Sequence, residues 1–476
     1  MNKRNRWGVE VSVVGVDALY RRTLRRIAAK IPFVEARSYR LKGRRRQYIA
    51  IVALNLFALM GGCEIALLAH LIGIMWSMLL GGSLFFVLCV AYVKMLPRVV
   101  YATRLPEIDV AKLLERQVVP LKSAKAERAL RGKIILVTGA AGSIGSEVCR
   151  QLLNYQSGCV IALDTNETGL FDLQESLRAH PAISRLRATI GDITDAGSMS
   201  CLFARYKPDI VFHAAAYKHV PLLEDHPDQA VRTNVLATYR LCLLAQEHQV
   251  SRFVFVSTDK AAEPTSVLGA SKRLGEMIIQ SLAQAGQGDT CFCAVRFGNV
   301  IGSRGSVVPL FTQQIEQGGP VTVTDPEAMR YFMTIPEACG LVISTAALAA
   351  QGGLYVLDMG EPVKIVELAE KMIRLRGLRE KQDIPIVYTG LRPGERLHEA
   401  LVAEGETLTQ TAYSKILSVT YRYSLPILQD IGCWMDMLEQ ELKRAEHEQL
   451  RESLFSMVHE YTLVPAGQSH NTAVWR

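Results

Sequence analysis

The stretch that most constrains the fold is an apolar run that ends in a glycine-rich turn and continues into a helical pattern, "IILVTGAAGSIGSE", residues 134–147. Gly139, Gly142 and Gly145 follow the spacing G-x-x-G-x-x-G, not the commoner G-x-G-x-x-G. Glycines at such a turn let the backbone approach a pyrophosphate, and the start of the helix offers free N–H groups and a positive dipole end. The pattern predicts a dinucleotide site on a parallel sheet, with a plain tight turn as the alternative.

Short β-branched runs alternate with amphipathic stretches from Lys133 to about residue 300, among them "CVIALD", "RATIGDI", "DIVFHAAA", "RFVFVS" and "FCAVRFG". This alternation predicts an α/β fold with a doubly wound parallel sheet. The rhythm then breaks into loops, short strands and helices. We therefore expect a Rossmann domain over residues 131–300 and a smaller substrate-binding lobe with C-terminal helices over residues 301–476, closing over the carboxyl ends of the strands.

Carboxylates at the ends of the second and third expected strands refine the cofactor. Asp164 lies 19 residues after Gly145, where a carboxylate binds the adenosine ribose 2′-hydroxyl and repels a 2′-phosphate, so NAD is favoured and NADP is the alternative. Asp192 suits the adenine. The expected cofactor-binding residues are Gly139, Gly142, Ser143, Ile144, Gly145, Asp164, Asp192, Ile193, Ala214, Ala215 and Lys272.

Residues 48–93 are apolar for 46 positions, and Glu64 is the one charged residue among them. A membrane span needs about 20 residues, so the stretch predicts two transmembrane helices, with a single re-entrant hairpin as the alternative. Basic residues precede the stretch at Arg44–Arg46 and follow it at Lys94 and Arg98. The positive-inside rule then assigns both flanks to the cytoplasm.

The net charge of +8 comes from residues 1–47, which hold 14 Lys or Arg and 3 Asp or Glu. No basic motif interleaved with aromatic residues follows, so we expect a basic cytosolic segment and no nucleic-acid partner. Residues 94–130 predict a charged, mostly helical connector. The ten cysteines contain no C-x-x-C pair and have no histidine partners at zinc spacing, so we expect reduced thiols and no metal site.

Six segments occur in an order that one family shares: "TGAAGSIGSE", "FHAAAYKHVPLLEDHPDQAVRTNV", "STDKAAEPTSVLGASKRLGE", "VRFGNVIGSRGSVVPLF", "MRYFMTIPEA" and "LRPGERLHE". In them the chain closely resembles the CapD-like, membrane-bound nucleoside-diphosphate-sugar 4,6-dehydratases of bacterial surface-glycan synthesis, which are extended short-chain dehydrogenase/reductases. The resemblance covers about residues 107–420 and implies a location at the inner (cytoplasmic) membrane. Long members carry about four spans and a further domain, so the N-terminal part is abbreviated by comparison.

A 4,6-dehydration requires removal of hydride from sugar C4, loss of the C5 proton with the C6 hydroxyl, and return of the hydride to C6. Thr258, Asp259 and Lys260 at one strand end suit this chemistry, and the resemblance implies the same roles. Protonated Asp259 could donate to the departing hydroxyl. Lys260 could accept the C5 proton if burial lowers its pKa, and Thr258 could hydrogen-bond the C4 oxygen. The alternative is a helix cap followed by a solvated lysine.

Lys272 is the fourth expected catalytic residue, because it follows Leu268 at the spacing of the Tyr-x-x-x-Lys pair used by related dehydrogenases and epimerases. This i,i+4 spacing puts both side chains on one helix face. Lys272 can hold the nicotinamide ribose, but Leu268 cannot exchange a proton. The membrane-bound dehydratases usually have methionine there. The missing phenol disfavours a simple 4-epimerase.

A set of polar residues is expected to bind the substrate. Arginine suits phosphate oxygens, and the resemblance puts the loop with Lys218 and His219 beside the sugar and Glu395 on a ribose hydroxyl. The set is Lys218, Asn299, Arg304, Arg330, Arg392 and Glu395, with Arg396 as a further candidate. Lys218 and His219 have a solvated-loop alternative, some of the arginines should form plain salt bridges, and Asn234 is expected to be structural.

We therefore expect a lyase that converts a UDP-N-acetyl-hexosamine, first of all UDP-GlcNAc, into its 4-keto-6-deoxy derivative for surface polysaccharide. The alternatives are a UDP-sugar C4 or C5 epimerase and a non-catalytic nucleotide-binding membrane scaffold. A homo-oligomer is expected. The apolar helix "SKRLGEMIIQSLA" could pack in a dimer, and a buried face explains it equally well.

Overall fold

The computed structural model describes residues 123–286, 288–348, 351–422 and 424–462. The expected basic segment (1–47), the expected transmembrane helices (48–93) and most of the connector (94–130) therefore lie outside the described residues. Among the helices in the described ranges, none has both the length and the apolar character needed to cross a bilayer. The end of the connector forms α5 (Ala124–Leu130), which buries Ala126 and Leu130.

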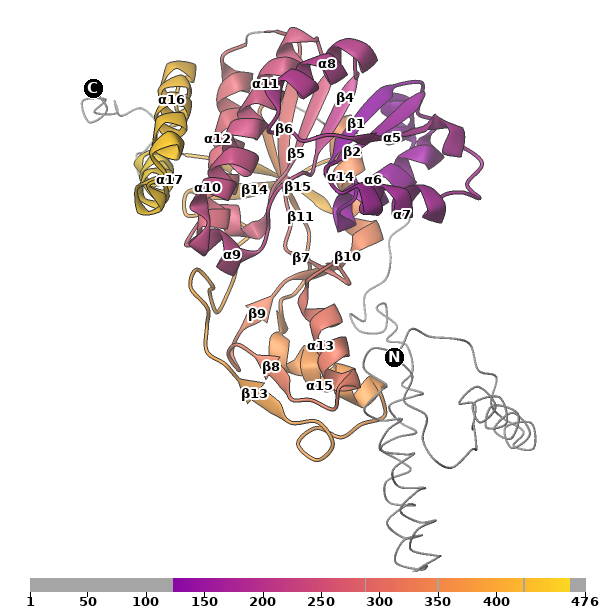
Figure 1. Cartoon of the computed structure of the whole chain (residues 1–476), viewed down its shortest axis with the longest axis vertical. Helices are drawn as coiled ribbons and strands as arrows, with labels where there is room; N and C mark the ends of the chain where they lie inside the picture. The colour runs from indigo at the N-terminus through magenta and orange to yellow at the C-terminus, as the bar shows by residue number, and fades with distance from the viewer. Residues whose placement is uncertain (1–122, 287, 349–350, 423, 463–476) are drawn as a thin grey trace, which may run out of the picture. The chain divides into compact units, whose positions relative to one another are not determined.

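A nine-stranded sheet forms the centre of the larger lobe, in the order β14-β15-β11-β6-β5-β4-β1-β2-β3 (Figure 1). Its first seven strands in chain order pair in parallel, whereas β15 runs antiparallel to β11 and β14. The order β3-β2-β1-β4-β5-β6 is that of the doubly wound dinucleotide-binding fold, so the predicted α/β class is confirmed. The strands are β1 (Ile134–Thr138), β2 (Cys159–Asp164), β3 (Leu186–Ile190), β4 (Ile210–His213), β5 (Arg252–Val256), β6 (Cys291–Arg296), β11 (Gly353–Leu357), β14 (Glu406–Gln410) and β15 (Ile416–Tyr421).

Helices cover both faces of this sheet because alternate strand residues are apolar on both sides. In β1, Leu136 belongs to an apolar core that includes residues of α8, α11, α12, α16 and α17, whereas Ile135 and Val137 belong to a second core that includes residues of α5, α6, α7 and α14. These helices are α6 (Ser143–Leu152), α7 (Glu167–Ser176), α8 (Ala196–Tyr206), α11 (Ala237–Glu247), α12 (Val267–Gln284), α14 (Ile335–Leu348), α16 (Leu428–Arg444) and α17 (His447–Thr462). The two short helices α9 (Val220–Asp225) and α10 (Pro227–Gln229) lead into a π-helical stretch, Ala230–Leu236.

The smaller lobe has its own apolar core, in which Phe311, Val321 and Met372 are buried. Figure 1 shows it below the carboxyl ends of the parallel strands. Its elements are β7 (Asn299–Ile301), α13 (Val307–Glu316), β8 (Val321–Val323), β9 (Met329–Arg330), β10 (Phe332–Thr334), β12 (Val363–Lys364), α15 (Ile365–Leu375) and β13 (Ile386–Tyr388).

The expected boundary at residue 300 requires a correction. Strands β11, β14 and β15 and helices α14, α16 and α17 all follow residue 300, yet they belong to the larger lobe. The chain therefore passes between the lobes several times. Periodicity along the sequence could not reveal this, because an apolar strand has the same pattern in either lobe.

Helix α12 is buried on all sides, from Val267 to Ala283. The sheet covers one side, and α16 and α17 of the same chain pack on the other. The apolar helix that could have packed in a dimer is thus explained by burial within the chain.

Candidate functional site

A cavity of about 610 Å³ lies at the carboxyl ends of the parallel strands, walled by the sheet on one side and by elements of the smaller lobe on the other. Most of the residues expected from the sequence line it. These are Gly139, Gly142, Ser143, Ile144, Gly145, Ala214, Lys218, Thr258, Lys260, Lys272, Asn299, Arg304, Arg330, Arg392 and Glu395, together with His219 and Leu268. Asp164, Asp192, Ile193, Ala215 and Asp259 are not in its wall.

The glycine-rich turn is shaped by close backbone packing. Gly139 has φ of +69°, and a Cβ there would lie 2.7 Å from the backbone of Ala215. A Cβ on Gly145 would collide with the Gly139 carbonyl, and one on Gly142 would lie 3.1 Å from the same oxygen. Gly142 is the N-cap of α6 and uses no side chain to cap it. The open helix start therefore forms a cradle that fits a pyrophosphate.

Asp164, at the end of β2, braces this turn. Its Oδ2 accepts a hydrogen bond from the Ala141 amide at 2.9 Å, and its Oδ1 accepts one from Asn166 N at 2.9 Å. Asp192, after β3, accepts from the amide and hydroxyl of Thr194, both at 2.8 Å. Ile193 is buried in the core, and the Ala215 backbone packs against Gly139. Asp164 thus lies beside the turn, as suits an adenosine ribose, and Asp192 lies just after the neighbouring strand β3.

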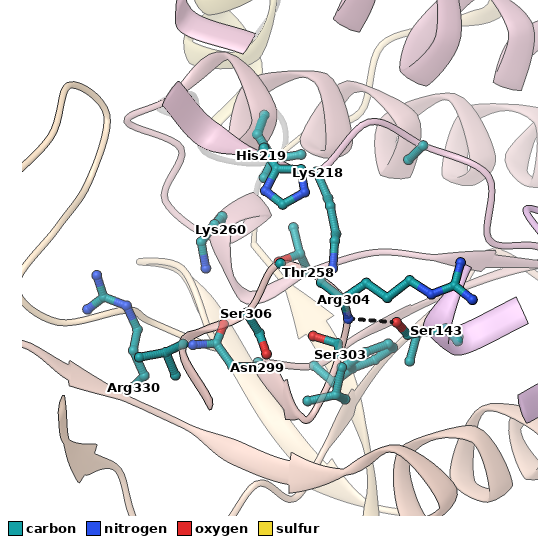
Figure 2. A pocket seen from close by; sticks show the side chains of 18 of the residues that line it. Ser143, Lys218, His219, Thr258, Lys260, Asn299, Ser303, Arg304, Ser306 and Arg330 are labelled. Carbon is teal, nitrogen blue, oxygen red and sulfur yellow. Dashed lines mark hydrogen bonds between the residues drawn. The ribbon is translucent and has the colours of Figure 1, made fainter. Parts of the chain in front are cut away.

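Thr258, Asp259 and Lys260 follow β5, and Figure 2 shows the Thr258 hydroxyl and the Lys260 amine pointing into the cavity. Asp259 lies behind them and is 1% exposed. Its Oδ1 accepts from Thr258 Oγ1 at 2.8 Å, from Lys260 N at 2.9 Å and from Lys260 Nζ at 3.0 Å. Its Oδ2 is buried with no hydrogen-bond donor in the described residues. Asp259 therefore acts on its two neighbours, which form the wall.

The Lys260 amine also contacts a carboxylate that the sequence analysis did not assign. Glu399 Oε1 lies 3.4 Å from Lys260 Nζ and 3.8 Å from Arg330 Nε. Burial alone would lower the pKa of Lys260, but Asp259 and Glu399 outweigh burial and raise it. The expectation of a lowered lysine pKa is therefore wrong, because two negative charges surround an amine that was predicted only to be buried.

Lys272 lies on α12 with Leu268 one turn before it, and both line the cavity. Lys272 Nζ donates to the Val256 carbonyl at 2.9 Å and lies 4.5 Å from the centre of the Phe255 ring. Burial lowers the pKa of Lys272 to about 7, partly offset by Glu276. Leu268 is 4% exposed. The position of the usual tyrosine is thus filled by an apolar side chain against the cavity.

Arg304 lines the cavity and is hydrogen-bonded to the glycine-rich turn. Its Nη1 donates to the Ala141 carbonyl at 3.1 Å, and its backbone amide donates to Ser143 Oγ at 3.0 Å, as Figure 2 shows for the latter. Lys218 Nζ in turn donates to the Arg304 carbonyl at 2.8 Å. The segment around Arg304 therefore lies across the glycine-rich turn and is hydrogen-bonded to it.

The remaining expected substrate residues divide into two groups. Asn299, Arg392 and Glu395 line the cavity, and Glu395 accepts from the Arg392 amide at 3.2 Å. Arg396 pairs with Glu263 at 2.9 Å and does not line the cavity, as expected for one of the arginines. Asn234 bonds both the amide and the carbonyl of Tyr217 and is structural.

Sequence reasoning missed three polar residues at the site. Ser303 and Ser306 line the cavity on either side of Arg304, and the Ser306 hydroxyl is buried without a partner in the described residues. Glu399 contacts Lys260. All three lie inside segments that carried the family resemblance, so a signal was present, but nothing in their spacing singled them out.

Comparisons with known proteins agree with this geometry. The family model described as "Polysaccharide biosynthesis protein" matches residues 135–421. The capsular polysaccharide biosynthesis protein CapD of Staphylococcus aureus is 49% identical over 66% of this chain and 52% of its own length. The probable polysaccharide biosynthesis protein EpsC of Bacillus subtilis is 45% identical, with the same coverage. The chain thus spans about half the length of these curated relatives.

Among solved structures, DesIV from Streptomyces venezuelae, a dTDP-glucose 4,6-dehydratase with NAD bound, is 26% identical and superposes with a TM-score of 0.50. The match covers 57% of this chain and 88% of that chain.

Proposed function

Since this chain belongs to the polysaccharide biosynthesis protein family, we propose that it is an NAD-dependent nucleotide-sugar 4,6-dehydratase, with UDP-GlcNAc as its substrate. The observation that carries the proposal is the Thr258–Asp259–Lys260 turn, which presents a hydroxyl and an amine to a cavity that begins at a glycine-rich turn. The CapD and DesIV likenesses support a nucleotide-sugar reaction.

The residues around the glycine-rich turn fit NAD. The α6 N-terminus would hold the pyrophosphate, Asp164 the adenosine ribose and Lys272 the nicotinamide ribose. When bound, NAD supplies the acceptor for the C4 hydride and returns the hydride to C6. The other steps fall to side chains of this chain.

Thr258 orients the sugar at C4. Its hydroxyl hydrogen is donated to Asp259 Oδ1, so its oxygen is left to accept a hydrogen bond. The C4 hydroxyl of the substrate is a donor of the kind that this oxygen fits. When C4 is oxidised, the proton of its hydroxyl passes to the Thr258 oxygen as the Thr258 proton passes to Asp259 Oδ1. Leu268 cannot take part in this exchange.

Lys260 exchanges the protons of the elimination. Its resting ammonium first loses a proton to solvent, which leaves a free amine beside Asp259 Oδ1, 3.0 Å away. The C5–H bond of the 4-keto sugar then breaks, its proton goes to Nζ, and the electron pair moves toward the C4 carbonyl. The new ammonium returns that proton to the C6 hydroxyl as the C6–O bond breaks and water leaves. Once the hydride is on C6, the proton held by Asp259 passes through Lys260 Nζ to C5, and both side chains return to their starting states. This reverses the expectation that Asp259 donates directly, because Asp259 lies behind the wall.

The test is mass spectrometry of UDP-GlcNAc incubated with the purified full chain and NAD. Loss of one water, with deuterium from D2O at C5, is the expected result, and Lys260→Ala should abolish both. A product of unchanged mass with altered configuration would identify an epimerase. Bound NAD without any turnover of UDP-sugars would identify a nucleotide-binding scaffold.

We also propose that the chain is held at the membrane. Residues 48–93 would anchor the enzyme at the inner membrane, with the catalytic domain in the cytoplasm. Membrane fractionation of the full chain against a chain that begins at residue 107 tests it, and equal recovery of both in the soluble fraction would refute it.

A further inference from the structure

Four charged side chains of alternating sign lie together at one wall of the cavity. Asp259 contacts Lys260, Lys260 contacts Glu399, and Glu399 contacts Arg330. The exposed fractions of the Asp259 and Glu399 side chains are 1% and 5%, so solvent screens neither carboxylate. Two positive and two negative charges balance within this cluster.

Glu399 reaches Lys260 because its segment is fixed by backbone contacts. The Met329 amide and Arg330 Nη1 both donate to the Leu397 carbonyl, at 2.8 and 3.0 Å, so Leu397 is held against β9, two residues before Glu399. A few residues later the Ala403 amide donates to buried Glu406 at 2.9 Å. The carboxylate is therefore brought from the C-terminal third of the chain to a turn that is more than a hundred residues away in sequence.

We propose that Glu399 is a positioning residue for the dehydration: its carboxylate holds the Lys260 ammonium at the cavity wall and, together with Asp259, sets the charge of that amine. The inference rests on the proposed function for its catalytic meaning. The effect of Glu399 on the charge of Lys260 follows from the contacts alone.

The charges that face Lys260 determine what loss of Glu399 does. Burial and Arg330 disfavour the ammonium, whereas Asp259 and Glu399 favour it. In Glu399→Gln one of the two favourable charges is lost and both unfavourable influences remain. The pKa of Lys260 should therefore fall, and the free amine should be present at a lower pH.

Competitive acetylation of the full chain with acetic anhydride, read out on the Lys260 peptide by mass spectrometry, measures this without any turnover. At pH 9 acetylation of Lys260 should be about tenfold faster in Glu399→Gln than in the wild type, because loss of one of the two carboxylates that face the ammonium lowers the pKa of Lys260 and leaves more free amine. Glu399→Asp keeps the charge and should stay within about threefold of the wild type. The control is Glu404→Gln, which removes an exposed carboxylate from the same segment and should change nothing.

Equal acetylation rates in Glu399→Gln and the wild type would overturn the inference. Thermal unfolding and NAD binding check that the variant is folded. If Glu399→Gln does not fold, Glu399→Met, which fills a similar volume without charge, must give the same tenfold increase, and a rate equal to the wild type again overturns the inference.

Turnover gives the second readout. The rise of kcat with pH that reports deprotonation of Lys260 should be absent in Lys260→Met. In Glu399→Gln this rise should occur at lower pH, with a nearly unchanged KM. In Glu399→Asp it should occur at the same pH as in the wild type. If Lys260 is acetylated faster in Glu399→Gln but the wild type does not dehydrate the sugar, the dehydratase function is refuted and the effect of Glu399 on Lys260 is confirmed. If the wild type dehydrates the sugar but the pH profile of kcat is the same in Glu399→Gln, only the role of Glu399 is refuted.

Discussion

Ser257, the residue directly before Thr258, donates its hydroxyl hydrogen to Glu276 Oε1 at 2.6 Å. Glu276 belongs to a fully buried group of charges with Arg273, Arg296 and Glu406. Arg296 contacts both carboxylates, at 2.7 Å for Glu276 and 2.6 Å for Glu406. The strand end that carries the proposed chemistry is thus fastened to an ion network that links β6, α12 and β14.

Glu406→Gln should destabilise the protein by about 3–5 kcal/mol, because removal of one partner leaves buried arginines with too little negative charge. Urea unfolding followed by circular dichroism measures this. The control is Glu439→Gln, since Glu439 and Arg240 are both 38% exposed, and such pairs contribute less than about 1 kcal/mol. A loss no larger than that of the control would mean that the network does not stabilise the fold.

The same residue predicts the response to acid. Burial alone would raise the pKa of Glu406, but Arg296 and Arg273 outweigh it and hold the pKa at about 2, against 4.5 for an unperturbed glutamate. A carboxylate whose pKa is lower in the folded state stabilises the protein at pH values above its unfolded-state pKa. This contribution is lost as the pH falls toward the folded-state pKa, so the free energy of unfolding should decrease by about 3 kcal/mol between pH 5 and 2. The stability gap between the wild type and Glu406→Gln should therefore shrink over that range, and a constant gap would contradict the assignment.

Much of this architecture follows from sequence, but the network does not. Local periodicity predicted the parallel sheet, and the glycine spacing and Asp164 predicted the turn and its neighbour. Arg296 pairs with Glu406, which lies 110 positions later in the chain. Lys260 likewise pairs with a residue far along the sequence, Glu399. Periodicity carries no information on such pairs, so the raised pKa of Lys260 and the position of Asp259 behind the wall could not be inferred from residue types.

Leu268→Met should retain kcat within about threefold, because neither side chain exchanges protons and a swap of similar volume costs little. Leu268→Tyr should not increase dehydration, since Thr258 and Lys260 already provide the contacts that the mechanism uses. Steady-state kinetics with UDP-GlcNAc measures both. A marked gain from tyrosine would indicate that the site lacks a proton carrier at C4.

Asp164 should set the cofactor preference. A carboxylate at this strand end favours a free ribose 2′-hydroxyl over a 2′-phosphate, so NAD should bind at least about tenfold more tightly than NADP. Asp164→Ser should weaken the binding of NAD and reduce the difference between the affinities for NAD and NADP. Fluorescence titration with both dinucleotides measures this. Asp172→Ser, a change on the exposed face of α7, is the control. Equal affinity of the wild type for both would contradict this role.

Arg304→Ala should raise the Kd for NAD more than the KM for the nucleotide sugar. Arg304 lies across the glycine-rich turn, so its positive charge is near the site proposed for the pyrophosphate. Arg396→Ala, which removes a guanidinium paired with Glu263, should leave the Kd for NAD unchanged. The reverse pattern, with the sugar KM raised and the Kd for NAD unaltered, would return Arg304 to the substrate.

The repeated crossing between the lobes has a consequence for biosynthesis. As the polypeptide leaves the ribosome, the turn at residues 257–260 and both network arginines emerge well before Glu406, which is 133 positions beyond Arg273. Until then a single carboxylate, Glu276, faces two guanidinium groups, and the edge of β11 has no β15 beside it. Completion of the catalytic lobe therefore waits for translation of the C-terminal third, a stage at which the nascent chain depends on protection from aggregation.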